Sequence, residues 1–489
     1  MKSGSSNGLA AVRIQKPSPA RIKAVGNWCP PRGEPDSESG PGVAPYPRLC
    51  PEHVEQIVRL ADAFRLDAAA LEVSMQPLYP HCAGLDVHKD SIFACARHLR
   101  DGAKATETVR SFSATSRGLS ALGDWLVAEE VTDAAMESTG VYWKPVWNLL
   151  EGRVKLMLVN AQHIKQVPGR KTDVKDSQWI AQLLQHGLLT PSFVPERPQR
   201  ELRDLTRQRA QLSGDLACVA NRIQKVLEDA NIKLGSVATD VLGVSGRDML
   251  KALVGGQSDP AAIAQLARGR MKVKIPALTE ALTGRVNDHH RFMLKTLLEQ
   301  VAHLEKQIEA FDSRIEQVMT PFEKEAIGRL DGIPGVNRRS AENILAEIGT
   351  DMTRFPDAAH LASWAGLCPG NHQSAGKRKS GRITQGNHWL KRTLTQCALA
   401  AGNKNGSFLQ SRFRRLAAKR GRKRAAIAVA HSQLTAIYEM LKNHTEYHDL
   451  GANYLDQLQR ERVKRHLVNR LQGLGYQVNL NELPGKAVA

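Results

Sequence analysis

The sequence lacks long apolar runs, paired cysteines and a leader-like start. No apolar run approaches the roughly 20 residues that a membrane-spanning helix needs. The first residues, MKSGSSNGLAAVRIQKP, contain no apolar stretch of the kind found in secretory signals. The seven cysteines are scattered without a CxxC pair, which argues against a zinc ribbon and a disulfide scaffold and fits a reducing compartment. We therefore expect a cytoplasmic protein with no membrane partner.

Acidic residues are missing altogether between Ala358 and Tyr438. The same stretch holds fifteen cations, which is most of the excess behind a net charge of +19 for 489 residues. A solvated surface normally interleaves both signs, whereas a patch of one sign attracts phosphate through counterion release. We therefore expect this stretch to bind nucleic acid, although charge does not say which kind. The predicted phosphate contacts are Lys377, Arg378, Lys379, Arg382, Lys391, Arg392, Arg412, Arg414, Arg415, Arg420, Arg422, Lys423 and Arg424.

Composition and periodicity divide the chain into five segments. The first, residues 1–80, looks like a partly disordered extension rich in Pro, Gly and Ser, with one amphipathic helix expected over Glu52–Val73. The remaining segments are an α/β domain, a coiled-coil region with a helical insert, a helical domain and a charged tail. Their predicted bounds are 81–192, 193–325, 326–443 and 444–489.

The α/β segment alternates between strand and helix patterns. CAGLDVHKDSIFACARHL is typical of two strands joined by a tight turn, and residues 108–113 are expected to form a third strand. Short apolar strands are expected in TDAAMEST and VKLMLVN, with helices over 118–130, 141–152 and 176–187. Strands followed by strand–helix alternation predict a mixed α/β sheet.

Two long segments carry apolar residues at heptad spacing. The first runs from Leu202 to Ala230 and the second from Leu294 to Val318. This spacing predicts coiled-coil packing, either as an antiparallel hairpin within one chain or between subunits. Arg209 falls on the seam of the first segment, where a polar residue is expected to specify the register or the partner.

Four acidic residues stand at the ends of predicted strands or at the start of a helix. Asp86 ends the first strand in GLDVHKDS, and Glu137 ends the strand in TDAAMEST. Asp173 and Asp176, in KTDVKDS, lie at or just before a helix. Carboxylates that converge from element ends suit Mg²⁺, which takes oxygen ligands and leaves positions open for phosphate. Each residue alone is better explained as a surface acid, a cap or a turn residue, but together the four predict a metal site.

The order of these elements and acids resembles the RuvC-like branch of the ribonuclease H fold. The motifs GLDVHKDS, ESTGVYWKPVWNLLEG and VNAQHIKQVPGRKTDVKDSQWIAQLLQHGLL are similar to the N-terminal DEDD domain of the insertion-sequence 110 transposase family. The resemblance covers about residues 81–443. Tyr142 and Trp143 belong to the same motif, and a core position and a direct role are both open for them. The resemblance implies a catalytic, Mg²⁺-binding tetrad made of Asp86, Glu137, Asp173 and Asp176.

A second motif surrounds a serine in the acid-free stretch. In LASWAGLCPGNHQSAGKRKSGRITQGNHWLKRTL, Ser374 has small neighbours and no His/Asp partner at an obvious spacing, so the residues alone favour a turn serine over a hydrolase-type nucleophile. The motif resembles the C-terminal domain of the same family, which implies that Ser374 is the nucleophile. The SAG wording before the KRK run resembles the 1111 subgroup. Ser380 is a second candidate, and His372 and His388 are either phosphate contacts or structural residues.

A helix–turn–helix pattern precedes the serine motif. LDGIPGVNRRSAENILAEIG places Gly332 and Gly335 in a tight turn between two helices. The turn resembles a helix–hairpin–helix, in which backbone N–H groups bind a phosphate without base specificity. A turn that serves only packing is equally open. The whole pattern predicts a fold that is α/β plus all-α: a RuvC-like ribonuclease H domain, a coiled-coil insert and a helical transposase domain.

The resemblance implies an enzyme that cuts and rejoins DNA to move an insertion sequence. Family members are guided by a structured bridge RNA whose loops pair with donor and target DNA, so that base pairing carries most of the sequence choice. An aromatic content of 5% fits a protein that stacks on few bases. The implied chemistry uses Mg²⁺ at the tetrad and a covalent phosphoserine link between Ser374 and DNA.

The resemblance also implies a homo-oligomer, from dimer to tetramer, in a bacterial cytoplasm near the nucleoid. The acidic site and the serine would come from different subunits, with the heptad helices as dimerisation elements. Two other functions stay open at this point. One is a metal-dependent, RuvC-like, structure-selective nuclease that uses water as the nucleophile, and the other is a non-catalytic nucleic-acid-binding protein.

Overall fold

The computed structural model describes residues 78–99, 105–138, 140–160, 176–370, 372–374 and 377–480, with the backbone alone for 372–374 and 377–379. The chain divides into two compact units. The first, Met1–Leu156 with Val167–Leu189, contains nearly all of the α/β sheet, and the second, Met157–Gln166 with Thr190–Ala489, is mainly helical. The expected helix over 52–73 lies outside the described residues.

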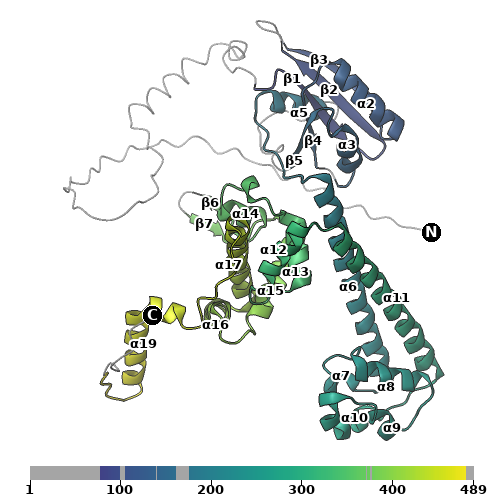
Figure 1. Cartoon of the computed structure of the whole chain (residues 1–489), viewed down its shortest axis with the longest axis vertical. Helices are drawn as coiled ribbons and strands as arrows, with labels where there is room; N and C mark the ends of the chain where they lie inside the picture. The colour runs from purple at the N-terminus through teal and green to yellow at the C-terminus, as the bar shows by residue number, and fades with distance from the viewer. Residues whose placement is uncertain are drawn as a thin grey trace, which may run out of the picture. The chain divides into compact units, whose positions relative to one another are not determined.

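The first unit is built on a five-stranded mixed sheet. The strand order is β3-β2-β1-β4-β5, with β2 antiparallel to both β1 and β3, and with β4 parallel to β1. Figure 1 shows the sheet with α2, α3 and α5 around it. The strands and helices expected from the sequence are confirmed, with bounds that shift by a few residues. They are β1 (His81–Val87), β2 (Ser91–His98), β3 (Thr106–Ser113), α2 (Ser116–Ala128), β4 (Asp133–Glu137), α3 (Trp143–Leu150), β5 (Lys155–Val159) and α5 (Asp176–Gln185).

Helix α5 lies directly against β1 and runs in the opposite direction. The approach is possible because Gly84 has no side chain: a Cβ there would overlap the backbone of Ala181. The thiol of Cys82 donates to the Ala181 carbonyl at 3.5 Å, and the Leu78 amide before β1 donates to the Gln185 carbonyl at the end of α5 at 2.9 Å. The start of α5 therefore lies at the end of the sheet where β1 finishes.

The second unit begins with a long helical hairpin. The two heptad segments form α6 (Arg197–Asp229) and α11 (Asp288–Val318), which lie side by side in Figure 1. His290 at the start of α11 bonds Asp229 at the end of α6, with 2.9 Å between Nε2 and Oδ2, so the helices are antiparallel. The buried seam is apolar over most of its length, including Val219, Ile223, Leu294 and Val301. Within the described residues the hairpin alternative is thus the one seen, and packing between subunits stays a prediction.

Short helices close the far end of this hairpin. They are α7 (Leu234–Val237), α8 (Val244–Val254), α9 (Pro260–Ala264), the 3₁₀ helix η3 (Gly269–Lys274) and α10 (Ile275–Ala281). Asp259 caps α9 by accepting bonds from the amides of Ala261 and Ala262. Leu234, Met249 and Leu278 are buried with the hairpin seam in one core cluster. The insert therefore folds onto the hairpin as a part of the same core.

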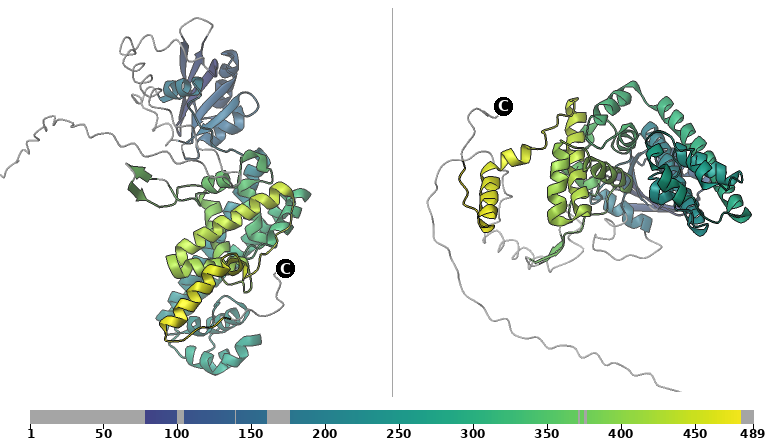
Figure 2. Two further views of the ribbon diagram at one scale, coloured as in Figure 1. Left: turned by 90° about the vertical axis from the view of Figure 1, so that its left-hand side faces the viewer. Right: turned by 90° about the horizontal axis from the view of Figure 1, so that it is seen from below.

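The rest of the second unit is a helical domain packed around α17. Tyr438 on α17 is buried and donates its hydroxyl to the Phe355 carbonyl at 3.1 Å. Helices α15 and α17 lie next to each other in Figures 1 and 2. The elements are α12 (Pro321–Asp331), α13 (Arg338–Ile348), η4 (Met352–Arg354), α14 (Ala358–Trp364), β6 (His372–Ser374), β7 (Lys377–Ser380), α15 (His388–Ala401), α16 (Phe408–Arg420), α17 (Arg422–Asn443), α18 (Tyr454–Leu458) and α19 (Arg460–Gly473).

Arg209 joins the hairpin to this helical domain. Its guanidinium bonds the carboxylate of Glu342 on α13, the carboxylate of Asp312 on α11 at 3.1 Å, and the amide oxygen of Asn343 at 2.8 Å. The polar seam residue thus has its partners in the same chain. Among the described helices none is long and apolar enough to cross a membrane.

Candidate active site and nucleic-acid interface

Asp86 and Glu137 lie at neighbouring ends of two parallel strands. The register pairs Gly84 with Ala135 and Leu85 with Met136, and the two acids are the next residues on β1 and β4. Side chains at matched positions of neighbouring strands point to the same face of a sheet. The two carboxylates therefore share one face at the carboxyl edge of the sheet. Prediction and structure agree on this placement.

Asp176 is brought to the same edge by α5. It is the first residue of the helix. Because α5 runs antiparallel to β1 across Gly84, its start lies by the end of β1. The fourth predicted acid, Asp173, lies outside the described residues. Within the described part of the chain, no three acidic, histidine or cysteine side chains are placed so that they could hold a metal ion. Asp86, Glu137 and Asp176 therefore share a sheet edge without forming a metal site by themselves, although carboxylates are the ligand type that Mg²⁺ takes.

Asp86 has a histidine partner that the sequence reasoning missed. The side chain of Asp86 is 16% exposed, and its Oδ2 lies 3.0 Å from Nε2 of the exposed His88. The two-residue separation in GLDVHKDS is the signal that was available. The His88 ring therefore occupies one carboxylate oxygen of a predicted metal ligand.

The aromatic motif after β4 divides between surface and interior. Tyr142 precedes α3 and is 40% exposed, next to the exposed Val141. Trp143 is half-buried and meets Trp147 edge to face, with ring centroids 6.0 Å apart. Trp143 is thus partly covered without being a core residue, whereas Tyr142 is largely exposed to solvent.

Ser374 ends the first strand of a two-stranded hairpin. It pairs with Lys377 on β7, so the predicted nucleophile and the first residue of the KRK run face each other across the turn. The side chains of Ser374, Lys377, Arg378, Lys379 and His372 are outside the described part. The second candidate, Ser380, accepts a bond from the Arg382 amide at 3.1 Å, as a turn serine does.

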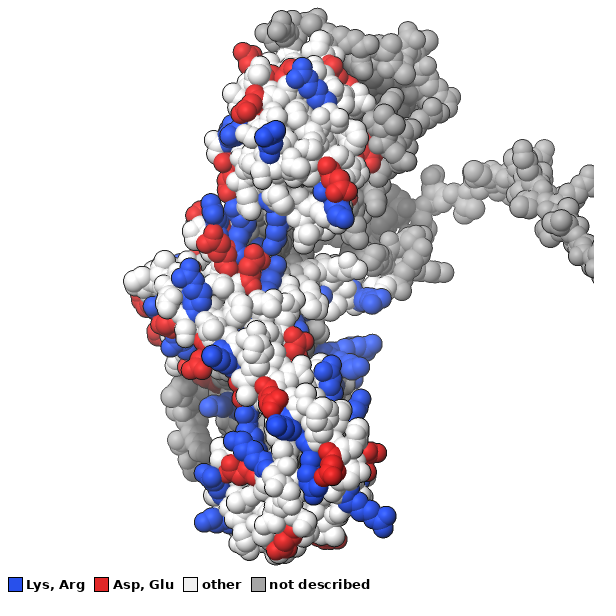
Figure 3. All heavy atoms as spheres, turned by 90° about the vertical axis from the view of Figure 1, so that its right-hand side faces the viewer, with Lys and Arg blue, Asp and Glu red and all other residues white. Residues whose placement is uncertain are grey.

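The predicted phosphate contacts are mostly surface cations. Four of them, Arg420, Arg422, Lys423 and Arg424, are exposed around Gly421, where α16 ends and α17 begins. Cationic side chains are more widespread than acidic ones on the face shown in Figure 3. Arg415 differs from the others because it pairs with Asp456, which lies beyond the acid-free stretch. Its charge is therefore partly compensated in the folded chain.

The turn between α12 and α13 is packed against other helices. Gly335 has a φ of +85°, and a Cβ there would overlap the backbone of Cys397 and Ala401 on α15. The Pro334 carbonyl accepts a bond from Gln433 on α17 at 2.9 Å. These contacts give Gly335 a packing role. Phosphate binding by this turn, including Gly332, stays a prediction.

Two family models match the chain. One, for the DEDD domain of IS110 transposases, matches residues 83–232, which include the sheet, its acids and α6. The other, for transposases of the IS116/IS110/IS902 family, matches residues 328–413, which include the α12–α13 turn and the serine hairpin. The chain belongs to the IS110 family of transposases. It is therefore a DNA transposase or recombinase, as the sequence predicted.

Relatives of this transposase come from several bacteria. The chain is 26% identical over 303 residues to an insertion element IS110 protein of 43.6 kDa from Streptomyces coelicolor, covering 57% of the chain and 73% of the relative. It is 27% identical over 329 residues to an IS900 protein of 42 kDa from Mycobacterium paratuberculosis, covering 60% and 80%. A pilin gene-inverting protein of Moraxella bovis is 27% identical over 154 residues, covering 30% and 48%. Membership of the 1111 subgroup stays a prediction.

Proposed function

We propose that this transposase cuts DNA with Mg²⁺ held by Asp86, Glu137, Asp173 and Asp176 and with Ser374 as the nucleophile. The observation that supports the proposal is the placement of Asp86, Glu137 and Asp176 at one sheet edge, through strand register and through the approach of α5 over Gly84. Surface acids without a shared role would not be expected to lie at one edge on three different elements. Mg²⁺ bound there would stabilise negative charge on the scissile phosphate.

The serine step forms one bond to phosphorus and breaks another. The Ser374 oxygen attacks the phosphorus and loses its proton, while the bond from phosphorus to one DNA oxygen breaks and that oxygen leaves as a hydroxyl. The phosphoserine ester keeps the bond energy, so a DNA hydroxyl can reverse the attack after strand exchange without ATP. The cations near the serine hairpin would hold the phosphates during this exchange.

We infer that a structured bridge RNA supplies the sequence choice. The family resemblance supports this, as does a chain with 68 Lys and Arg but an aromatic content of only 5%. Such a protein is suited to read backbone and shape, because base stacking needs aromatic rings. The partners proposed are therefore donor DNA, target DNA and one non-coding RNA.

A homo-oligomer, from dimer to tetramer, completes the proposal. Asp86 and Ser374 belong to different compact units of the chain. This division is compatible with a site assembled from the acids of one subunit and the serine of another. The exposed flanks of α6 and α11 are the surfaces proposed to pair subunits.

Trapping the covalent intermediate tests the serine mechanism. The full chain, bridge RNA and Mg²⁺ are incubated with a nicked suicide DNA that loses one fragment after cleavage. We expect a protein–DNA adduct that Ser374→Ala abolishes and Ser380→Ala keeps, with Asp86→Asn losing the adduct but not DNA binding. The reverse pattern for the two serines would assign the nucleophile to Ser380.

The same experiment separates the alternative functions. Cleaved DNA without an adduct would replace the serine mechanism by a nuclease that activates water. DNA binding by the wild type with neither an adduct nor strand transfer in any divalent metal would mean a non-catalytic protein with a decayed site. Either result would overturn the proposal.

A further inference from the structure

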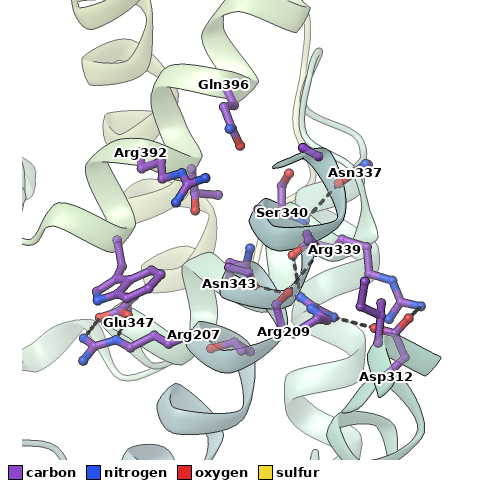
Figure 4. A pocket seen from close by; sticks show the side chains of 18 residues that line it. Arg207, Arg209, Asp312, Asn337, Arg339, Ser340, Asn343, Glu347, Arg392 and Gln396 are labelled. Atoms are coloured by element: carbon purple, nitrogen blue, oxygen red, sulfur yellow. Dashed lines mark hydrogen bonds and ion pairs between the residues drawn. The ribbon is translucent and has the colours of Figure 1, made fainter. Parts of the chain in front are cut away.

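A polar pocket opens where the hairpin meets the helical domain, and none of the predicted acids lines it. It has a volume of about 430 Å³ and is lined by α6, α11, α13 and α15, all in the second unit. This is within the range of about 300–1,000 Å³ that small-molecule sites occupy. Figure 4 shows Arg392 and Gln396 extending from α15 toward Ser340 and Asn343 on α13.

Small residues on α6 leave one wall of the pocket open. Ala210, Ser213, Gly214 and Ala217 line it at the spacing of one helix face. A Cβ added at Gly214 would meet no atom within 4 Å. The space over this face is therefore not occupied by other parts of the described chain.

Apart from Arg392, the charged groups of the other walls have partners within the chain. Arg207 donates two bonds to Glu347, at 2.7 and 2.8 Å, and Asn387 donates a third at 2.6 Å. The same guanidinium lies 5.7 Å from the ring centre of Trp389. These bonds hold the walls in place and leave little net charge on them.

A small set of groups remains available to a ligand. The exposed Arg392 has no ion pair among the described residues. The amide oxygen of Asn343 is engaged by Arg209, which leaves its NH₂ group to donate. Gln396 offers a second amide, and half-buried Trp389 offers an indole ring. The set combines one cation, two amides and one aromatic surface.

We propose that this pocket binds one unpaired nucleotide of a single-stranded segment, a role that rests on the proposed nucleic-acid chemistry. Arg392 takes the phosphate, Trp389 takes the face of the base, and the amides of Asn343 and Gln396 bond its edge. A simple anion could take Arg392 and the amide N–H groups, but it would leave the indole ring without a partner. The pocket is a holding site for a flipped base, separate from the Ser374 hairpin.

A plug variant tests the pocket without changing charge. Gly214→Leu projects a side chain into the open wall, and it favours the helix because Gly is the weaker helix former. Gln208→Leu adds the same side chain to an exposed position of α6 that does not line the pocket. Circular dichroism melting checks that both variants fold.

The probes separate base, sugar and phosphate. The full chain is titrated with fluorescent oligothymidylate, oligouridylate and an abasic phosphodiester strand, each of about twelve nucleotides. We expect the wild type and Gln208→Leu to prefer a strand with bases over the abasic strand. In Gly214→Leu this preference should fall by about 5- to 100-fold, the worth of one stacked base. A larger loss for one of the two base-containing strands identifies the source as DNA or RNA.

Two outcomes would overturn the inference. If Gly214→Leu binds every strand as tightly as the wild type does, the pocket holds no nucleotide. An equal loss for the abasic strand would show that the pocket takes phosphate alone. Neither outcome bears on the Ser374 adduct, whose absence would instead contradict the proposed function.

Discussion

Arg209 occupies a seam position that an apolar residue would normally take. Its side chain is 5% exposed, and its partner Glu342 is 1% exposed. Taking both charges out of water is costly, and their mutual bonds offset that cost only while both are present. The pair therefore contributes more to which helices meet than to overall stability.

Removal of one partner should be much worse than removal of both. Arg209→Met should lower the free energy of unfolding by about 3 kcal/mol, because it leaves Glu342 buried beside weaker partners. Urea unfolding followed by circular dichroism measures this loss. Arg197→Met, whose side chain is 76% exposed, is the control and should cost below about 1 kcal/mol. Equal losses of stability in Arg209→Met and Arg197→Met would contradict this cost of an unpaired buried charge. The same holds if the double variant Arg209→Met with Glu342→Met is no more stable than Arg209→Met alone.

Buried thiols provide a second test at the residue scale. Burial raises the pKa of Cys82 and of Cys95 to about 12, whereas Cys218 is exposed. In native protein at about pH 8, iodoacetamide should modify Cys218 well before the other two, because the thiolate is the reactive form. Peptide mass spectrometry measures the order. Since unfolded thiols ionise first, these two cysteines should lower stability as the pH rises from about 9 toward 12. Early modification of Cys82 would contradict the packing of α5.

At the scale of elements, the placement of α5 decides whether the acids can act together. Strand register alone brings Asp86 and Glu137 to one edge. Asp176 arrives there only because the helix crosses β1 at Gly84, where a side chain would displace it. The placement of Asp176 at this edge therefore depends on a residue that carries no chemistry.

A side chain at Gly84 should impair catalysis more than folding. Gly84→Val pushes α5 outward, and a shift of about 1 Å in a catalytic group costs on the order of 100-fold in rate. Over-packing should also cost about 1–3 kcal/mol of stability. Adduct formation in Mg²⁺ and thermal unfolding measure the two effects. Ser111→Val, on exposed β3, adds the same side chain to the same sheet and should change neither. Normal adduct formation by Gly84→Val would show that Asp176 is not needed at this edge.

At the scale of the whole molecule, the charges are divided between the two units. The proposed metal-binding carboxylates lie in the α/β unit, and the acid-free stretch lies in the helical one. The junction of α16 and α17 gathers cations where a helix also begins, and helix N-termini favour anions. This junction is therefore expected to contribute much of the salt dependence of nucleic-acid binding.

Removal of the junction cations should flatten that salt dependence. Each lost phosphate contact should reduce the slope of log Kobs against log salt by about 0.9 for duplex DNA. Titration of one fixed duplex at several salt concentrations measures the slope. The test variant replaces Arg420, Arg422, Lys423 and Arg424 by Ala. The control variant replaces four exposed cations of the hairpin, Arg222, Lys225, Lys295 and Lys306. If the slope falls as much in the control as in the test variant, the junction is not the main site of phosphate contact.

Local pattern was enough to predict most elements and part of the site. Asp86 and Glu137 could be placed because strand ends are visible in apolar runs, and parallel strands finish at one edge. The heptads predicted α6 and α11 but left hairpin and subunit packing open, because an apolar seam suits either. The partners of Arg209 could not be predicted, since Glu342 is 133 residues away along the chain. The pocket beside Trp389 was missed for a similar reason, because its walls come from distant segments. His88 was missed although it stands only two residues from Asp86, because contacts between side chains leave no periodic signal.

The sequence by itself determined the family, the order of strands and helices, and the acid-free stretch, because these depend on residue types and on spacings within one segment. Only the tertiary structure decided that α6 and α11 form a hairpin within the chain, that Gly84 admits α5 to the acidic edge, and that a pocket lies between α6 and α15. The physical reason is that each of these depends on atoms from distant segments coming within van der Waals or hydrogen-bonding distance. Such close approaches are set by the packing of the whole unit and not by any one stretch of chain.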